Sequence, residues 1–235
     1  MPLFVLFLSI YLFTVAGNLG LILVIRTDSR LHTPMYFFLS NLAFVDFCYS
    51  SVITPKMLGN FLYKQNVISF NSCAVQLGCF LTFMVSECLL LASMAYDRYV
   101  AICKPLHYVT IMNNVVCRRL ILCCWMAGLL IIIPPLSLGL HLEFCDSNDI
   151  DHFFCDAVPL LKISCSETWL IEQMIIVCAV LTFIMTLVCV VLSIIHHQDH
   201  FTIPFCPAKE KGFFYMFFPY NCGFYHLWNL HLHLY

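Results

Sequence analysis

The stretch MAYDRYVAICKPLHY, Met94–Tyr108, closes an apolar run that begins at Cys73 and contains a single charged residue, Glu87. It places an acid, a base and an aromatic side by side, as Asp97, Arg98 and Tyr99. An apolar run of about 20 residues is long enough to cross a bilayer as a helix. The stretch therefore marks a point where a membrane helix meets water, and its charged triplet is a candidate for contact with a soluble partner.

The composition of the whole chain also indicates a membrane protein. Of the 235 residues, 62% are hydrophobic and 10% are charged, whereas soluble domains carry about 25% charged residues. A soluble fold of this size could not cover its surface with so few charges. The net charge of −2 gives no reason to expect nucleic acid as a partner, so the lipid bilayer is the expected surrounding.

Five segments are apolar and long enough to span a bilayer. They cover residues 3–25, 35–58, 73–102, 120–140 and 169–195. The predicted fold class is an all-α membrane protein, with residues 1–195 as one bundle of five transmembrane helices. Residues 196–235 form an atypical tail that holds six of the ten histidines. Within it Gly212–Tyr235 is uncharged, but Pro219 and Gly223 favour an interfacial or irregular tail over a sixth span.

The basic residues predict the orientation. Eight lie at the ends of spans one, three and five or after them: Arg26, Arg30, Arg98, Lys104, Arg118, Arg119, Lys209 and Lys211. Three lie at the ends of spans two and four or after them: Lys56, Lys64 and Lys162. Because Lys and Arg concentrate on the cytoplasmic side, we expect an extracellular N-terminus. The acidic segment His141–Thr168 then lies on the outer face.

Two acids are predicted to lie near the middle of the bilayer. Asp46 is 12 residues from Pro34, and Glu87 is 10 residues from Asp97, so at 1.5 Å per residue they lie roughly 18 and 15 Å from the inner face. Two anions at one depth are costly unless they bind a cation or take up protons. Asn18 offers a further oxygen. A sodium site and a pair of protonated acids that lock the helices are both open on this basis.

Four cysteines lie at the outer face, which is oxidising: Cys73, Cys145, Cys155 and Cys165. They predict two disulfides, and the sequence alone allows three pairings. The histidines His196, His197 and His200 raise the alternative of a zinc site. No acid and base framework accompanies them, so we expect no enzyme and no cofactor apart from the sodium ion.

The chain resembles the rhodopsin-like (class A) G-protein-coupled receptors, and specifically their olfactory receptor branch. The resemblance is carried by Met94–Tyr108, by LHTPMYFFLSNLAFVD at Leu31–Asp46, by PKML at Pro55–Leu58, and by Gly17-Asn18. It covers residues 3–193. It implies that Asp97 holds Arg98 at rest, and that Arg98, released on activation, contacts the α subunit of a heterotrimeric G protein of the olfactory stimulatory type. It also favours sodium at Asp46.

The resemblance further implies the disulfides Cys73–Cys155 and Cys145–Cys165, because the FFCD pattern at Phe153–Asp156 supplies the partner of the third-span cysteine. It implies a pocket for a small volatile odorant. Five side chains at helical spacing on spans three and five would line this pocket: Phe80, Leu81, Met84, Cys178 and Thr182. Ordinary helix packing by the same residues is the alternative.

The family pattern ends after Ser193, and spans six and seven have no counterpart. The resemblance thus predicts a receptor truncated after five of seven spans. We expect an odorant receptor in the plasma membrane, with a non-signalling membrane product retained in the endoplasmic reticulum as the alternative.

Overall fold

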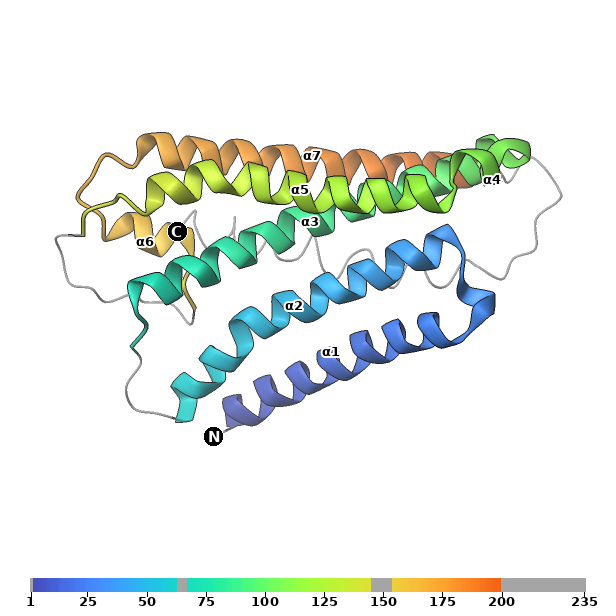
Figure 1. The fold of residues 1–235 in the computed structure, drawn as a ribbon. Helices are drawn as coiled ribbons and strands as arrows, with labels where there is room; N and C mark the ends of the chain where they lie inside the picture. The colour runs from blue at the N-terminus through green and yellow to red at the C-terminus, as the bar shows by residue number, and fades with distance from the viewer. Residues whose placement is uncertain (1, 63–66, 145–153, 200–235) are drawn as a thin grey trace.

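The computed structural model describes residues 2–62, 67–144 and 154–199, and these ranges are mostly helical (Figure 1). In chain order the helices are α1 (Pro2–Thr27), η1 (Ser29–Leu31), α2 (Pro34–Leu62), α3 (Phe70–Cys103), η2 (Pro105–His107), α4 (Tyr108–Ile111), α5 (Asn114–Gly139), α6 (Ala157–Lys162) and α7 (Trp169–Asp199). The long helices α1, α2, α3, α5 and α7 lie side by side. One β-bridge joins Phe144 to Ser164. The predicted class, an all-α membrane protein, is confirmed.

The helices α1, α2, α3 and α5 are long and apolar enough to cross a membrane, and α7 is apolar over Trp169–Met185. The chain is therefore a multi-pass membrane protein. The helix α5 begins six residues before the predicted start of its span at residue 120. This is because the Asn113 side chain accepts hydrogen bonds from the N–H groups of Val115 and Val116 at 3.0 Å and so caps the helix earlier.

The helix α7 continues to Asp199, past the predicted end of its span at residue 195. Most of the predicted tail, including the uncharged stretch Gly212–Tyr235, lies outside the described residues.

The third long helix, α3, is the centre of the bundle. It contacts α2, α5 and α7, while α1 packs on the far side of α2. Leu90 and Val100 of α3 are fully buried and belong to one apolar cluster with Phe38 and Val45 of α2. The outward side chains are apolar too, and Phe13 on α1 is 82% exposed. Such a surface is stable against lipid and costly in water.

The spans α5 and α3 approach each other closely at Gly128 of α5. A Cβ added at this position would overlap the Ser86 hydroxyl of α3 and lie 3.1 Å from the Thr82 carbonyl. Ser86 is fully buried, and its hydroxyl has no hydrogen-bond partner among the described residues. The absence of a side chain at Gly128 therefore lets α5 and α3 pack closely, as small residues do in membrane helix pairs.

Candidate functional site

The residues that the sequence singles out lie at the two ends of the bundle and in its middle. The Arg98 end comprises the end of α3, η2, α4 and the start of α5. The disulfide end comprises the end of α2, the start of α3, and α6. The two ends are about the length of α3 apart (Figure 1).

At the Arg98 end, Asp97 is 2% exposed and accepts a hydrogen bond from the Tyr108 hydroxyl at 2.9 Å. Tyr108 is the first residue of α4 and packs against the main apolar core. The pKa of Tyr108 is raised above that of an ordinary tyrosine, mainly because the phenol is buried and to a smaller extent because it donates a hydrogen bond to Asp97. The phenol is thus held as a proton donor, which suits an ionised carboxylate as its acceptor.

Arg98 points to a different neighbour from Asp97. Its guanidinium donates to the sulfur of Met35, in the first turn of α2. Tyr99, the third member of the triplet, is exposed. Asp97 thus bonds to Tyr108, Arg98 reaches the start of α2, and the Tyr99 ring stacks on that of Tyr96, 6.5 Å away between centroids.

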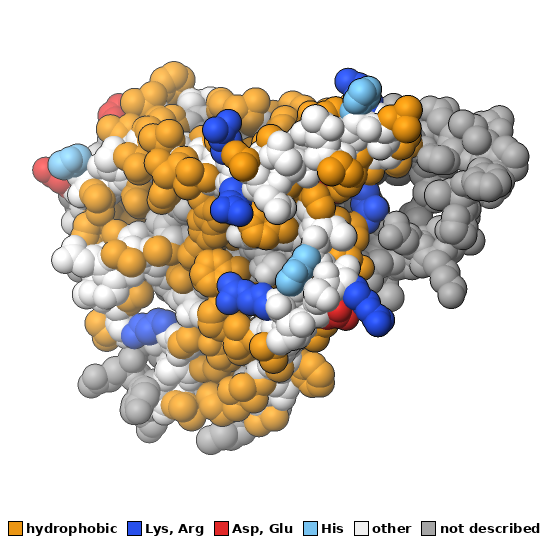
Figure 2. All heavy atoms as spheres, turned by 45° about the vertical axis from the view of Figure 1, so that its right-hand side comes forward, with side chains coloured by type: hydrophobic (Ala, Val, Ile, Leu, Met, Phe, Trp, Pro, Cys, Tyr) orange, Lys and Arg blue, Asp and Glu red, His pale blue; other side chains and the backbone are white. Residues whose placement is uncertain are grey.

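Basic side chains surround this end of the bundle. Arg26 lies in the last turn of α1, Lys104 directly follows α3, and Arg118 and Arg119 lie near the start of α5, all of them exposed. Figure 2, turned toward this end, shows Lys and Arg side chains scattered among apolar ones. The Arg98 end is thus a basic surface around one buried acid.

The predicted sodium ligands come from three neighbouring helices. Asp46 is half-buried on α2 and Glu87 is buried on α3. The Asn18 amide on α1 donates to the Thr14 carbonyl of its own helix at 3.0 Å. The two acids lie on helices that pack together, whereas the one hydrogen bond described for the Asn18 side chain stays within α1.

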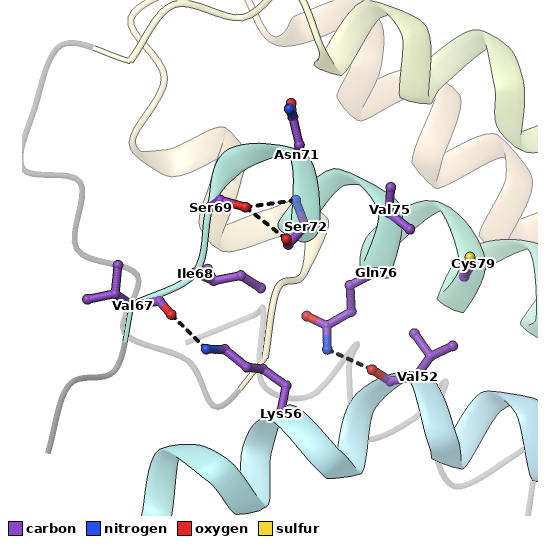
Figure 3. Close-up of a pocket in the computed structure, with 10 residues that line it drawn as sticks. All are labelled: Val52, Lys56, Val67, Ile68, Ser69, Asn71, Ser72, Val75, Gln76 and Cys79. Atoms are coloured by element: carbon purple, nitrogen blue, oxygen red, sulfur yellow. Dashed lines mark hydrogen bonds between the residues drawn. The ribbon is translucent and has the colours of Figure 1, made fainter. Parts of the chain in front are cut away.

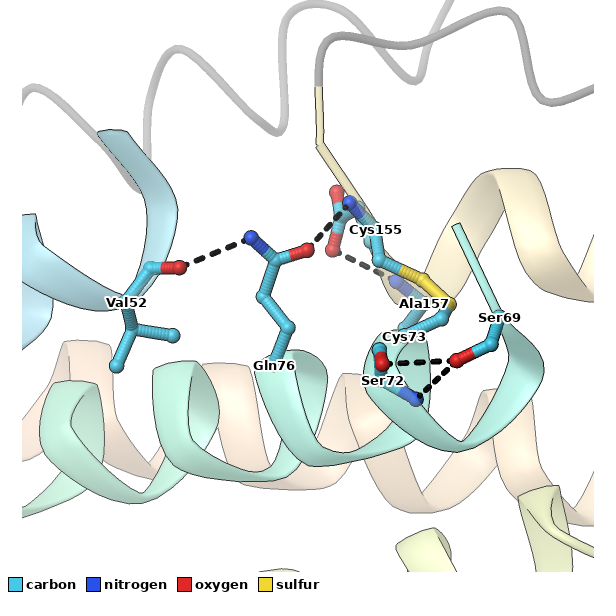
Figure 4. The surroundings of a disulfide bond; sticks show 8 residues. Val52, Ser69, Ser72, Cys73, Gln76, Cys155 and Ala157 are labelled. Atoms are coloured by element: carbon cyan, nitrogen blue, oxygen red, sulfur yellow. Dashed lines mark hydrogen bonds between the residues drawn. A yellow bond between two sulfur atoms is a disulfide. The ribbon is translucent and has the colours of Figure 1, made fainter. Parts of the chain in front are cut away.

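At the disulfide end, Cys73 of α3 is bonded to Cys155, with 5.4 Å between their Cα atoms (Figure 4). The predicted pairing of these two residues is confirmed. Cys165 is also in a disulfide, while Cys145, its predicted partner, lies outside the described residues. Asp156 follows Cys155 and caps α6 by accepting a bond from the Ala157 N–H at 2.7 Å.

Gln76 lies one turn after Cys73 and connects three segments. Its amide nitrogen donates to the Val52 carbonyl of α2 at 3.0 Å, and its amide oxygen accepts from the Cys155 N–H at 3.3 Å (Figure 4). The side chain is 6% exposed. A buried amide must use its donor and acceptor, and here both bonds hold the segment after the disulfide against α2 and α3. The sequence analysis did not identify this residue.

The five predicted odorant residues lie on α3 and α7. Phe80 is 2% exposed and lies between two rings, 5.0 Å from Tyr49 and 5.6 Å from Phe154 between centroids. Leu81 lines an apolar pocket of about 40 Å³ between α3, α5, α6 and α7. The other three, Met84, Cys178 and Thr182, are half-buried and do not line it.

A larger groove lies between α2 and α3 at the disulfide end, with a volume of about 590 Å³ (Figure 3). It is lined by Val52, Lys56, Val67, Ile68, Ser69, Asn71, Ser72, Val75, Gln76 and Cys79. We call it the Lys56 groove. The sequence analysis did not predict it, since a groove between two helices requires their relative placement.

Comparison with known proteins gives a consistent result. The family model described as olfactory receptor matches residues 7–215, which runs past the predicted boundary at residue 195. Olfactory receptor 8U9 of Mus musculus is 65% identical over 193 residues, which are 82% of this chain and 62% of that protein. The Homo sapiens protein of the same name is 63% identical over the same shares.

A further relative, Olfactory receptor 6C2 of Homo sapiens, is 57% identical over 212 residues, which are 90% of this chain and 68% of the relative. The chain spans about three fifths of the length of the 8U9 relatives that it matches.

Proposed function

Because the chain belongs to the olfactory receptor family, a family of receptors and not of enzymes, we propose that it senses small volatile odorants and signals through a heterotrimeric G protein. The observation that carries the proposal is the family match over residues 7–215. The match includes the Asp97-Arg98-Tyr99 triplet, which lies at one end of the central helix α3.

The proposal assigns a side of the membrane to each end of the bundle. The Arg98 end, with its exposed Arg and Lys side chains, faces the cytoplasm, in accordance with the preference of basic residues for that side. The disulfide end faces the oxidising exterior, where disulfides persist. We place the protein in the plasma membrane with its N-terminus outside.

Coupling to the G protein is proposed to start from the contacts of Asp97 and Arg98. In the structure Tyr108 satisfies the Asp97 carboxylate, and Arg98 reaches Met35 of α2. A guanidinium forms strong, often bidentate hydrogen bonds to the carbonyl and carboxylate groups that a bound protein can offer. Movement of α3 relative to α2 would free Arg98 to form them.

Odorant binding is proposed to involve the apolar pocket beside Leu81. Ligand pockets in membrane bundles lie between helices and are mostly apolar, and this one lies among α3, α5, α6 and α7. Its 40 Å³ is smaller than a volatile of six or more heavy atoms. We therefore propose that an odorant separates these helices as it enters, and that this separation is the movement transmitted along α3.

The test measures signalling and surface delivery together. Cells that express the tagged chain and the olfactory stimulatory G protein are challenged with volatile alcohols, aldehydes and ketones, and cAMP is measured alongside tag labelling on intact cells. We expect a cAMP rise in the parent chain. Arg98→Ala should remove it at equal surface labelling, whereas Arg118→Ala, another basic residue at the same end, should retain most of it.

A chain that reaches the surface but gives no cAMP rise, with basal nucleotide exchange equal to that of untransfected cells, contradicts the proposal. A response that survives in Arg98→Ala contradicts the role given to Arg98 and leaves odorant sensing in place.

A further inference from the structure

The apolar pocket beside Leu81 differs in character from the Lys56 groove. The lining of the Lys56 groove includes a lysine, an amide and serine hydroxyls. Every described residue that lines the apolar pocket has a hydrocarbon side chain or, in Gly139, no side chain. These residues come from α3, α5, α6 and α7 and from the segment after α5. The pocket therefore offers a ligand contacts with apolar atoms, and no described side chain in its lining offers a hydrogen bond.

This lining decides which ligand groups the pocket favours. A hydroxyl or carboxyl group that enters it loses its hydrogen bonds to water and finds no replacement among the described side chains that line it, which is costly. Thr182, the predicted odorant residue that carries a hydroxyl, lies outside the lining and donates to the Ala179 carbonyl of its own helix at 2.9 Å. Cavities lined by apolar side chains alone take up apolar molecules such as benzene. The lining thus matches a hydrocarbon.

Leu136 of α5 limits the space in the pocket. A Cβ added at Gly78 of α3 would lie 2.7 Å from Leu136 Cδ2 and 3.8 Å from Leu136 Cδ1. The Leu136 side chain thus takes up the space that a side chain at position 78 would need. Leu77 and Leu81, which precede and follow Gly78 on α3, line the pocket together with Leu136. Removal of the end of the Leu136 side chain would therefore join the space over Gly78 to the pocket.

We propose that this pocket binds volatile hydrocarbons, and that Leu136, packed over Gly78, limits the size of the molecule that it accepts. The inference rests on the proposed function, because it names the ligand class of the proposed odorant pocket. Binding and signalling are measured separately. A chain that binds a hydrocarbon and raises no cAMP keeps the ligand class and loses the proposed function. A cAMP response to alcohols or ketones without hydrocarbon binding overturns the inference and leaves odorant sensing in place.

The experiment compares toluene with phenol, which have equal numbers of heavy atoms and differ by a methyl group in place of a hydroxyl. Binding to the full chain in nanodiscs of phosphatidylcholine is measured by equilibrium dialysis, and uptake by empty nanodiscs is subtracted. Lipid headgroups accept a hydrogen bond from phenol, whereas the described side chains of the pocket accept none. The ratio of toluene to phenol bound by the protein should therefore exceed the ratio taken up by empty nanodiscs on the order of tenfold.

A filling variant assigns this binding to the pocket. Ala74 lies in the lining on α3. Ala74→Leu should lower the affinity for toluene on the order of tenfold, because the larger side chain occupies the space of the ligand in a closely packed site. Its melting temperature, measured without ligand, shows whether the variant is folded.

The size limit is tested with limonene, which is larger than toluene. Leu136→Ala removes three carbon atoms and should raise the affinity for limonene on the order of tenfold, with a smaller gain for toluene. Leu138→Ala, at an exposed position of the same helix outside the lining, should leave both affinities unchanged. Addition of Gly78→Val to Leu136→Ala returns three carbon atoms to the same space and should bring the affinity for limonene back toward that of the parent chain.

A protein that binds no more toluene than empty nanodiscs do, or binds toluene and phenol in the same ratio as they do, overturns the ligand class. So does a folded Ala74→Leu variant with unchanged affinity for toluene. If Ala74→Leu does not fold, Leu136→Ala decides, since equal affinities of parent and variant for limonene overturn both the site and its size limit.

Discussion

The Tyr108 hydroxyl donates a hydrogen bond to Asp97 Oδ1 at 2.9 Å and thereby joins α4 to the end of the central helix. Eleven residues separate the two, and η2 lies between them. The bond satisfies a buried carboxylate that has little access to water. It therefore fixes the position of the connection between α3 and α5 at the Arg98 end.

Tyr108→Phe should lower the free energy of unfolding by about 1.5–3 kcal/mol, because a buried acid loses a charge-assisted hydrogen bond. The measurement is thermal unfolding in detergent, followed by tryptophan fluorescence. Tyr96→Phe, which alters an exposed tyrosine of α3, is the control and should change the melting temperature little. Equal effects of the two substitutions would show that the Asp97 bond contributes nothing.

Stability should also fall at high pH in a way that depends on Tyr108. Its pKa is raised in the folded protein by burial and by Asp97, whereas the unfolded phenol ionises near pH 10. The contribution of this group is complete below about pH 10 and is lost as the pH rises above it. In scans from pH 8 to pH 11.5, the parent chain should lose more stability above pH 10 than Tyr108→Phe does. Parallel profiles would contradict the assignment.

Gly128→Ala should destabilise the bundle by about 1–3 kcal/mol, because the added methyl group overlaps the Ser86 hydroxyl and the backbone of α3 cannot yield freely. Gly59→Ala is the matched control. A Cβ there has no neighbour within 4 Å, so it should stabilise α2 by about 0.5–1 kcal/mol. Combining Gly128→Ala with Ser86→Gly should recover part of the loss. Unfolding curves that fail to separate the two glycine variants would rule out the close approach.

Cys155→Ser should cost about 2–5 kcal/mol, the usual loss for a native disulfide, here one that closes a loop with a sequence separation of 82 residues. The protein should also fail to reach the cell surface, as measured by tag labelling of intact cells. Cys123→Ser, which alters an exposed free cysteine, should leave both properties unchanged. Normal stability and delivery of Cys155→Ser would mean that the bond is dispensable.

Sodium should raise the melting temperature of the parent chain relative to potassium at equal ionic strength, because a ligand that binds the folded state stabilises it. Asp46→Asn should abolish the difference, since the proposed site loses its α2 carboxylate. Glu172→Gln, in the first turn of α7, serves as a control that removes an acid elsewhere. A parent chain that responds identically to both salts has no selective sodium site.

The spans could be predicted from the sequence because hydropathy sets them independently of tertiary contacts. The ends of the spans were predicted less accurately than their positions. Asn113 begins α5 six residues early by capping it, and a polar cap and the arginines that follow carry no apolar signal. The pairing of Cys73 with Cys155 came from the family resemblance, since spacing alone left three pairings open.

The contacts made by single polar side chains were beyond sequence reasoning. Tyr108 was part of the diagnostic stretch, yet its bond to Asp97 depends on the path of η2 and α4. Phe80 is predicted to line a pocket, and its contact with the Phe154 ring, 5.6 Å away between centroids, joins two segments that are distant in the sequence. Gln76 is an amide in an apolar run, one turn after Cys73. This position was the signal in the sequence for the hydrogen bonds that it makes to Val52 and Cys155.

The two hydrogen bonds of Gln76 have a mechanical consequence. The Gln76 amide nitrogen is bonded to α2 and its amide oxygen to the Cys155 N–H. The disulfide with Cys73 attaches Cys155 to α3 as well. The segment that begins at Cys155 is thus attached to α3 by a covalent bond and, through the Gln76 amide, to α2 as well. A displacement of Cys155 away from Gln76 would break the hydrogen bond between the Cys155 N–H and the Gln76 side chain.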